Sequence, residues 1–316
     1  MKGLRWIVWS MSLWCALLQG YIYEIKVLRK WNTSLNCYQY WIGFSDFHDK
    51  NHKDTNNQRK KIEEWLLLYA PNDILVLAED LSSANNELNA GYATYYINSR
   101  TGILAGLCTY CKQHQIPVVN VEYRYCRVVA LGPVINNISA DPSLFSSTKK
   151  ITIAQLVQEI EQMQMNLLKT NHVQFKVILT QKSAAVSNQM KKLTITSDSY
   201  KSMADYLNDL YKTNNRLELV QQLLTFDGIF IGMKFVDATL KADNAKKLLV
   251  FGGGTHINEA YELLQKIAGY EPVNAIDAQI FKGSLVSKSI GTPLIDTYRA
   301  KPEPISLELL EHYLKN

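Results

Sequence analysis

Short apolar runs alternate with amphipathic segments along this chain, and that alternation constrains the fold more than any other feature. The apolar runs have the length and composition of buried strands, and they occupy residues 40–44, 74–78, 118–121 and 248–251. Helical patterns separate or follow these runs, at residues 58–70, 101–115 and 255–268. This order is typical of a mostly parallel sheet whose faces are covered by helices. We therefore predict an α/β fold with a central sheet that is largely parallel or mixed.

The middle of the chain has a different texture. Strand signals thin out between about residues 141 and 225, and amphipathic helical patterns replace them. One such helix begins at a predicted capping box formed by Thr152 and Gln155. Only "FKVIL", residues 175–179, looks extended. We predict a helical insertion, about 141–225, on the α/β core. We also favour a helix over a strand for 227–246 and expect a last helix at 305–315.

The first twenty residues differ from all the others. Lys2 and Arg5 precede an uncharged apolar stretch, 6–18, which is short for a membrane span and typical of a signal peptide. We expect residues 1–20 to be removed by cleavage near Gly20 and the protein to be exported, either periplasmic or secreted. Residues 21–316 would form a single domain. An uncleaved anchor is the alternative, and it would be the chain's contact with a membrane.

The charge balance bears on partners. The formal net charge is only +5, and the chain has no long block of lysine and arginine and no signature of an RNA- or DNA-binding domain. Nucleic acid is therefore not an expected partner. We expect a small-molecule or peptide substrate instead.

Four cysteines remain when the N-terminal segment is set aside. They are Cys37, Cys108, Cys111 and Cys126, and in an exported chain they permit two disulfides with three connectivities. Cys108 and Cys111 form a C-x-x-C, which is either a redox pair or half a zinc site, or else two small apolar residues on one helix face. We favour the apolar interpretation because the motif lies inside the helical pattern and no second C-x-x-C exists.

Ionisable residues gather where the predicted strands end. His48 lies in the polar loop predicted at 45–57, just after the first strand, while Glu79 follows the second strand and His256 the last. Because the carboxyl ends of parallel strands share one edge of a sheet, where α/β proteins bind ligands, these residues are expected to meet there. Two imidazoles and a carboxylate suit a divalent metal ion that activates water. Without a metal, the same residues suit a histidine base oriented by a carboxylate.

Further polar residues near that edge are candidates for substrate binding. Glu122 and Arg124 follow the third strand, and Arg100 precedes the helical pattern at 101–115. We assign these three residues to substrate contacts. A structural ion pair is the alternative role for Arg124.

The stretch "FGGGTH", residues 251–256, is the best-defined turn in the chain. Its glycines allow a sharp turn or a close approach to a ligand. Thr255 is the predicted N-cap of the following helix, and Gly269 is predicted to end it. The turn lacks the lysine of a P-loop and the full G-x-G-x-x-G spacing, so nucleotide binding is disfavoured.

The last part of this turn, "GGTH", is a G-x-x-H motif that resembles the C-terminal motif of the TraB/Tiki superfamily, whose relatives include ChaN-like and erythromycin-esterase-like proteins. That family pairs it with an earlier G-x-x-H and with a glutamate after the next strand. The matching positions are His48, Glu79 and His256. The resemblance covers residues 40–270, with Ser45 where the first motif has glycine and Asp227 near the position of the family's arginine.

The resemblance implies three kinds of activity. Tiki members are described as metal-dependent proteases, ChaN as a haem-binding protein and the esterase-like members as metal-independent hydrolases. Our first hypothesis is therefore an exported hydrolase of peptides or esters, with His48, Glu79 and His256 as its centre. The alternatives are a non-enzymatic protein that binds haem, a metal or a peptide, and a purely structural exported protein.

Overall fold

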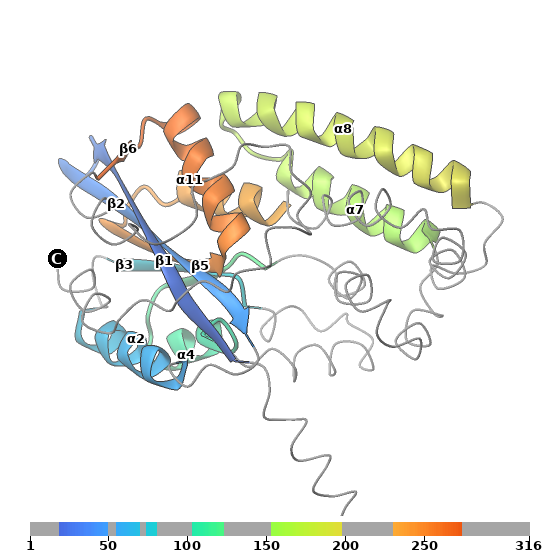
Figure 1. Cartoon of the computed structure of the whole chain (residues 1–316). Coiled ribbons are helices and arrows are strands. Elements are labelled where there is room, and N and C mark those ends of the chain that lie inside the picture. The colour runs from blue at the N-terminus through green and yellow to red at the C-terminus, as the bar shows by residue number, and fades with distance from the viewer. Residues whose placement is uncertain are drawn as a thin grey trace, which may run out of the picture.

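The computed structural model describes residues 19–49, 55–69, 74–80, 103–122, 153–197 and 230–273. Within these residues a six-stranded mixed sheet forms the centre of the molecule, and helices lie on both of its faces (Figure 1). The predicted α/β class is confirmed. The expected signal peptide falls mostly outside the described residues, and the predicted helix at 305–315 and residues 198–229 lie wholly outside them.

The strands are β1 (Gln19–Asn32), β2 (Cys37–Asp49), β3 (Ile74–Ala78), β4 (Val118–Asn120), β5 (Lys247–Gly253) and β6 (Glu271–Pro272). Their order across the sheet is β4-β3-β5-β2-β1-β6. The first four strands in that order are parallel to one another, whereas β1 is antiparallel to β2 and β6. The four predicted strands therefore lie in one sheet, and their carboxyl ends meet at one edge.

The long β1–β2 hairpin was not predicted. Its ladder runs from Gln19 opposite Asp49 to Asn32 opposite Cys37, with a register shift between Ile22 and Glu24. Residues 45–49, predicted to begin a polar loop, instead continue β2 because β1 supplies backbone partners along their whole length. The cleavage point expected near Gly20 lies at the second residue of β1.

The two faces of the sheet bury separate cores. One face packs against α11 (Gly254–Ala268), α7 (Ile153–Leu167), α8 (Val173–Ser197) and a helical segment at 230–240, around Trp41, Val250 and Phe235. The other face packs against α2 (Thr55–Tyr69) and α4 (Leu107–Gln113), around Phe44 and Phe251. Each fully buried side chain of this size stabilises the fold by about 1.5–3 kcal/mol.

Several helical predictions are confirmed, and one helix is shorter than predicted. Residues 230–240 are helical, and α11 buries its predicted apolar residues Ile257, Ala260, Leu264 and Ile267. In place of the helix predicted at 101–115, α4 begins only at Leu107. Gly106 has a φ of 73°, a left-handed conformation that cannot continue a helix in the N-terminal direction.

Within the predicted insertion, about 141–225, the structure describes two helices, α7 and α8, which pack side by side and extend beyond the sheet (Figure 1). The prediction that 175–179 is extended was wrong, since these residues lie in α8. Phe175, Leu179 and Val186 recur at helical spacing and are buried against the rest of the first core. A five-residue apolar window does not separate a strand from a helix, and here tertiary packing decides.

No helix among the described residues is both long and apolar enough to span a membrane.

Candidate functional site

The carboxyl edge of the parallel strands carries a row of polar groups on the face covered by α11. In the sheet, Ala78 lies opposite Phe251, Ser45 opposite Gly252, and Glu24 opposite Ser45. Glu79, the residue after Ala78, therefore begins a row that continues through Gly252 and Ser45 to Glu24. Ser45 donates a hydrogen bond to Glu24 Oε2 at 3.0 Å, which gives this serine a partner at the position where the family motif has glycine.

Glu79 is held in place from both ends. Its backbone N–H donates to the carbonyl of Phe251 at 2.9 Å, and its Oε2 accepts a hydrogen bond from the Gly253 N–H at 2.9 Å. The side chain is only 4% exposed. A carboxylate this deeply buried is costly unless hydrogen bonds or charges offset its desolvation, and the N-terminus of α11 contributes both a donor and a favourable dipole.

His256 lies in the first turn of α11 beside that carboxylate. Its Nε2 is 3.7 Å from Glu79 Oε1, and its side chain is 14% exposed. The other ring nitrogen, Nδ1, is buried, and within the described part of the chain it has no hydrogen-bond partner. The structure therefore brings two of the three expected residues together and leaves one imidazole nitrogen for another group.

The three glycines of the turn are explained by what surrounds them. A methyl group on residue 252 would lie 2.7 Å from the Phe235 ring and 3.3 Å from Glu79 Oε2. One on residue 254 would lie 1.8 Å from the hydroxyl oxygen of Tyr23. At residue 253 the nearest atom would be His256 Cδ2, at 3.3 Å. Positions 252 and 254 thus need glycine because side chains of the site already fill the space, whereas residue 253 has more room.

The predicted N-cap of α11 was wrong. The cap is Gly253, not Thr255, and no side chain of its own segment caps the helix. Glu79 performs that role from β3, because its carboxylate accepts the Gly253 N–H. At the other end, Gly269 has a φ of 68° and ends the helix as predicted.

The structure describes the other predicted site residues only in part. The backbone of His48 lies in β2, opposite Gly20 of β1, rather than in the predicted loop; its side chain is outside the part that the structure describes. Glu122 follows β4, is 5% exposed and donates its N–H to Asn120 Oδ1 at 3.0 Å. Arg124 and Arg100 are outside the described residues. Sequence reasoning missed Tyr23 and Glu24, which β1 brings to the site.

The residues of the site supply part of a donor set for the divalent metal ion that the resemblance implies. Within the described residues no group of three His, Cys, Asp or Glu side chains is able to hold a metal ion. His256 Nε2 and Glu79 Oε1, which lie 3.7 Å apart, are two donors of suitable chemistry for one ion. His48 would be the third ligand.

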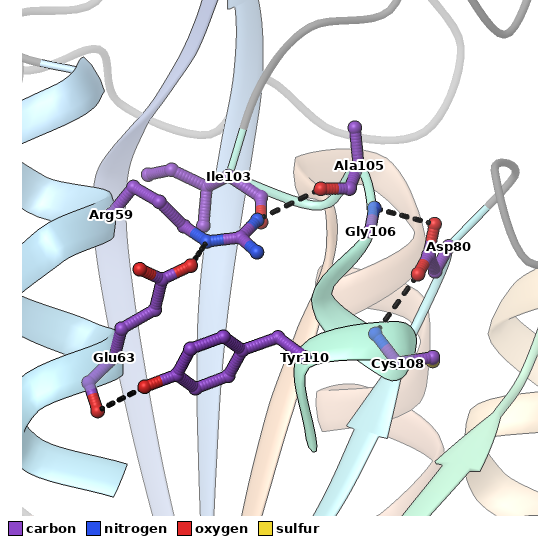
Figure 2. A network of polar contacts seen from close by, with 8 residues as sticks. All are labelled: Arg59, Glu63, Asp80, Ile103, Ala105, Gly106, Cys108 and Tyr110. Atoms are coloured by element: carbon purple, nitrogen blue, oxygen red, sulfur yellow. Dashed lines mark hydrogen bonds and ion pairs between the residues drawn. The ribbon is translucent and has the colours of Figure 1, made fainter. Parts of the chain in front are cut away.

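A second acidic residue, Asp80, has a structural role on the opposite face. Its carboxylate accepts the N–H groups of Gly106 at 3.1 Å and Cys108 at 2.9 Å (Figure 2). On the same segment, Arg59 of α2 donates to the carbonyls of Ile103 and Ala105 at 2.6 and 2.9 Å. Asp80 therefore caps α4 and, with Arg59, fixes residues 103–108 to the core.

The C-x-x-C belongs to this structural region. Cys108 and Cys111 are free thiols, both fully buried. The prediction that the motif lies away from the helix N-terminus was wrong, since Cys108 is the second residue of α4. Burial, followed by the negative charge of Asp80, nevertheless raises the pKa of the Cys108 thiol, and burial raises the pKa of Cys111 to about 11. These thiols are protonated at neutral pH, unlike those of redox pairs and zinc sites.

Comparisons of the chain with protein-family models, curated proteins and solved structures found no match.

Proposed function

We propose that this chain is a hydrolase of peptides or esters in which Glu79 and His256 form the acid–base pair, as the resemblance to the TraB/Tiki superfamily implies. The observation that carries the proposal is the placement of His256 Nε2 3.7 Å from the buried carboxylate of Glu79. The pair lies at the carboxyl edge of a parallel sheet, which is where α/β proteins place their ligand sites.

The chemistry follows from the two ring nitrogens. We assign the imidazole proton to Nε2 because a carboxylate accepts hydrogen bonds, and this leaves Nδ1 as the basic nitrogen. Nδ1 is buried in the free protein, so substrate binding would have to bring water to it. Nδ1 would then take a proton from that water as its oxygen adds to a substrate carbonyl. Glu79 would orient the ring and stabilise its protonated form. The 3.7 Å separation is longer than a hydrogen bond, and such contacts often shorten when substrate binds.

A divalent metal ion, if the protein uses one, would be held by Glu79, His256 and His48. It would supply an activated water at neutral pH. The same three residues are then required, so metal content separates the two versions of the proposal. Elemental analysis of the purified protein and assays with and without a chelator would distinguish them.

We also propose that the protein is exported, to the periplasm or outside the cell. A charged start and a short apolar core support this. Cleavage near Gly20 would remove only the first two residue pairs of the β1–β2 ladder, Gln19 with Asp49 and Gly20 with His48. The intact mass of the native protein checks the proposal, and a mature chain that begins at Met1 would contradict it.

The activity is tested with the chain from Tyr21 onward, 4-nitrophenyl esters and fluorogenic peptides. We expect wild-type turnover to fall by at least about 10²-fold in His256→Gln and Glu79→Gln, because each removes one member of an acid–base pair. The matched controls alter exposed residues of the same types. They are His114→Gln, at the C-terminal end of α4, and Glu64→Gln, in α2.

Three results would decide among the hypotheses. Turnover that depends on His256 and Glu79 supports the hydrolase. Equal activity in His256→Gln and His114→Gln would overturn it. Absence of turnover combined with metal, haem or peptide binding that Glu79→Gln weakens would favour the non-enzymatic binding protein.

A further inference from the structure

β1 contains an irregularity beside the candidate site. Ile22 lies opposite Asp46, but Glu24 lies opposite Ser45, so Tyr23 is the extra residue of a β-bulge. Bulges re-aim side chains and are over-represented next to active sites. In a regular strand successive side chains alternate between faces, whereas here Tyr23 and Glu24 both contact residues of the α11 side.

The bulge brings the Tyr23 hydroxyl directly against the start of α11. The oxygen lies so close to Gly254 that a methyl group on that residue would be 1.8 Å away, with the ring carbons Cζ and Cε1 next, at 2.8 and 3.2 Å. Gly254 is two residues before His256 and follows Gly253, whose N–H binds Glu79. Tyr23 is half-buried, so its side chain is ordered by packing yet keeps some access to solvent.

We propose that Tyr23 is a third functional residue of the site, whose hydroxyl donates a hydrogen bond to the carbonyl oxygen of the substrate. The inference rests on the proposed hydrolase function and adds a residue that neither the G-x-x-H motifs nor the glutamate supply. Three features support the proposal. They are the bulge, the absence of a side chain on Gly254 that makes room for the hydroxyl, and the position of Gly254 between His256 and Gly253, whose N–H binds Glu79.

The step balances as follows. The water oxygen adds to the carbonyl carbon, and the water proton passes to His256 Nδ1. The carbonyl π electrons move to the oxygen, where the Tyr23 O–H stabilises the developing negative charge without transferring its proton. On collapse the electron pair returns, the bond to the leaving group breaks, and the leaving oxygen or nitrogen takes the proton from His256.

The test is Tyr23→Phe, assayed on the same 4-nitrophenyl esters. We expect kcat to fall by about 10²-fold, the loss typical when one oxyanion donor is removed, with little change in KM. Tyr38→Phe is the matched control, because Tyr38 is an exposed tyrosine at the far end of the same hairpin.

Gly254→Ala gives an independent test that keeps the tyrosine. The methyl group displaces the hydroxyl, so this variant should lose activity as Tyr23→Phe does, and the double variant should lose little more than either single one. Near-UV circular dichroism checks that each variant is folded. A wild-type kcat in folded Tyr23→Phe would overturn the role of Tyr23 alone. Failure of His256→Gln to reduce wild-type turnover would overturn the proposed function and this inference together.

Discussion

Glu79 accepts a hydrogen bond from the N–H of Gly253, 174 residues further along the chain, at 2.9 Å. This contact joins the end of β3 to the start of α11, and it places the carboxylate beside His256. The same interaction therefore serves both the stability of the fold and the geometry of the site.

Glu79→Ala should destabilise the protein more than Glu79→Gln does. Alanine leaves the half-buried Gly253 N–H without its acceptor, which costs up to about 1–3 kcal/mol, whereas glutamine keeps an oxygen at that place. Urea unfolding followed by circular dichroism measures the difference. Glu64→Ala, on the exposed side of α2, should change the unfolding free energy by less than about 0.5 kcal/mol. Equal losses in Glu79→Ala and Glu79→Gln would show that the hydrogen bond is not what the glutamate contributes.

Gly252→Ala should destabilise the protein by about 1–3 kcal/mol, because its methyl group would overlap the buried Phe235 ring at 2.7 Å. Gly253→Ala is the matched control, because its methyl group would lie 3.3 Å from the nearest atom, His256 Cδ2. Urea unfolding again measures both. Combining Gly252→Ala with Phe235→Leu should recover part of the loss, and purely additive effects would argue against the predicted overlap.

The sequence predicted the four parallel strands because each is a contiguous apolar run. In β2, β3 and β5 the predicted residues are mostly buried on both faces, where no alternation is needed to recognise a strand, whereas the edge strand β4 is partly exposed. It did not predict β1, for two physical reasons. The bulge at Tyr23 shifts the period, so that Ile22 and Ile25 face the same core although they are three positions apart, an odd spacing. The strand also begins at Gln19, inside the segment assigned to the signal peptide.

The candidate site was predictable to a similar extent. That Glu79 and His256 share one edge follows from parallel strands whose carboxyl ends meet, and the structure places them 3.7 Å apart. That Glu79 caps α11 was not predictable, because the cap comes from another strand and replaces the local candidate, Thr255. The placement of Tyr23 depends on a one-residue bulge, which a sequence pattern does not reveal.

The buried thiols should make the protein less stable above about pH 9. In the unfolded chain Cys111 ionises near its ordinary pKa of 9.0, but burial raises its pKa in the folded protein to about 11. Between these values the unfolded state loses a proton that the folded state keeps, so stability falls as pH rises, by about 1.4 kcal/mol per pH unit for each such thiol. Cys108, whose pKa is also raised, adds to this slope.

Urea unfolding between pH 8 and 10.5 measures that slope. The Cys108→Ala/Cys111→Ala variant should show a flatter slope, and Tyr270, whose pKa burial also raises, is common to both proteins. In the folded protein at pH 8, iodoacetamide should modify the half-buried Cys37 and leave Cys108 and Cys111 unmodified. Alkylation of Cys108 or Cys111 at the rate of Cys37 would contradict the prediction.

Lys182→Ala should loosen the attachment of α8 to α11, with an effect that grows as pH rises. Lys182 Nζ contacts Glu259 Oε1, one turn beyond His256, and this is the ion pair between the two helices within the described residues. Burial raises the pKa of Glu259, and Lys182 is the main group that opposes the increase. Without the lysine that pKa rises further, so burying the ionised carboxylate costs more above its ordinary pKa of 4.5 than below it. We expect the free energy of unfolding to fall by about 1 kcal/mol at pH 7.5, since both side chains are partly exposed, and by less at pH 4.5.

Lys176→Ala, which alters an exposed lysine of the same helix, is the control in urea unfolding at both pH values. Adding Glu259→Gln should abolish the effect of Lys182→Ala, and a loss of the same size at the two pH values would show that the lysine acts through packing and not through the charge of Glu259.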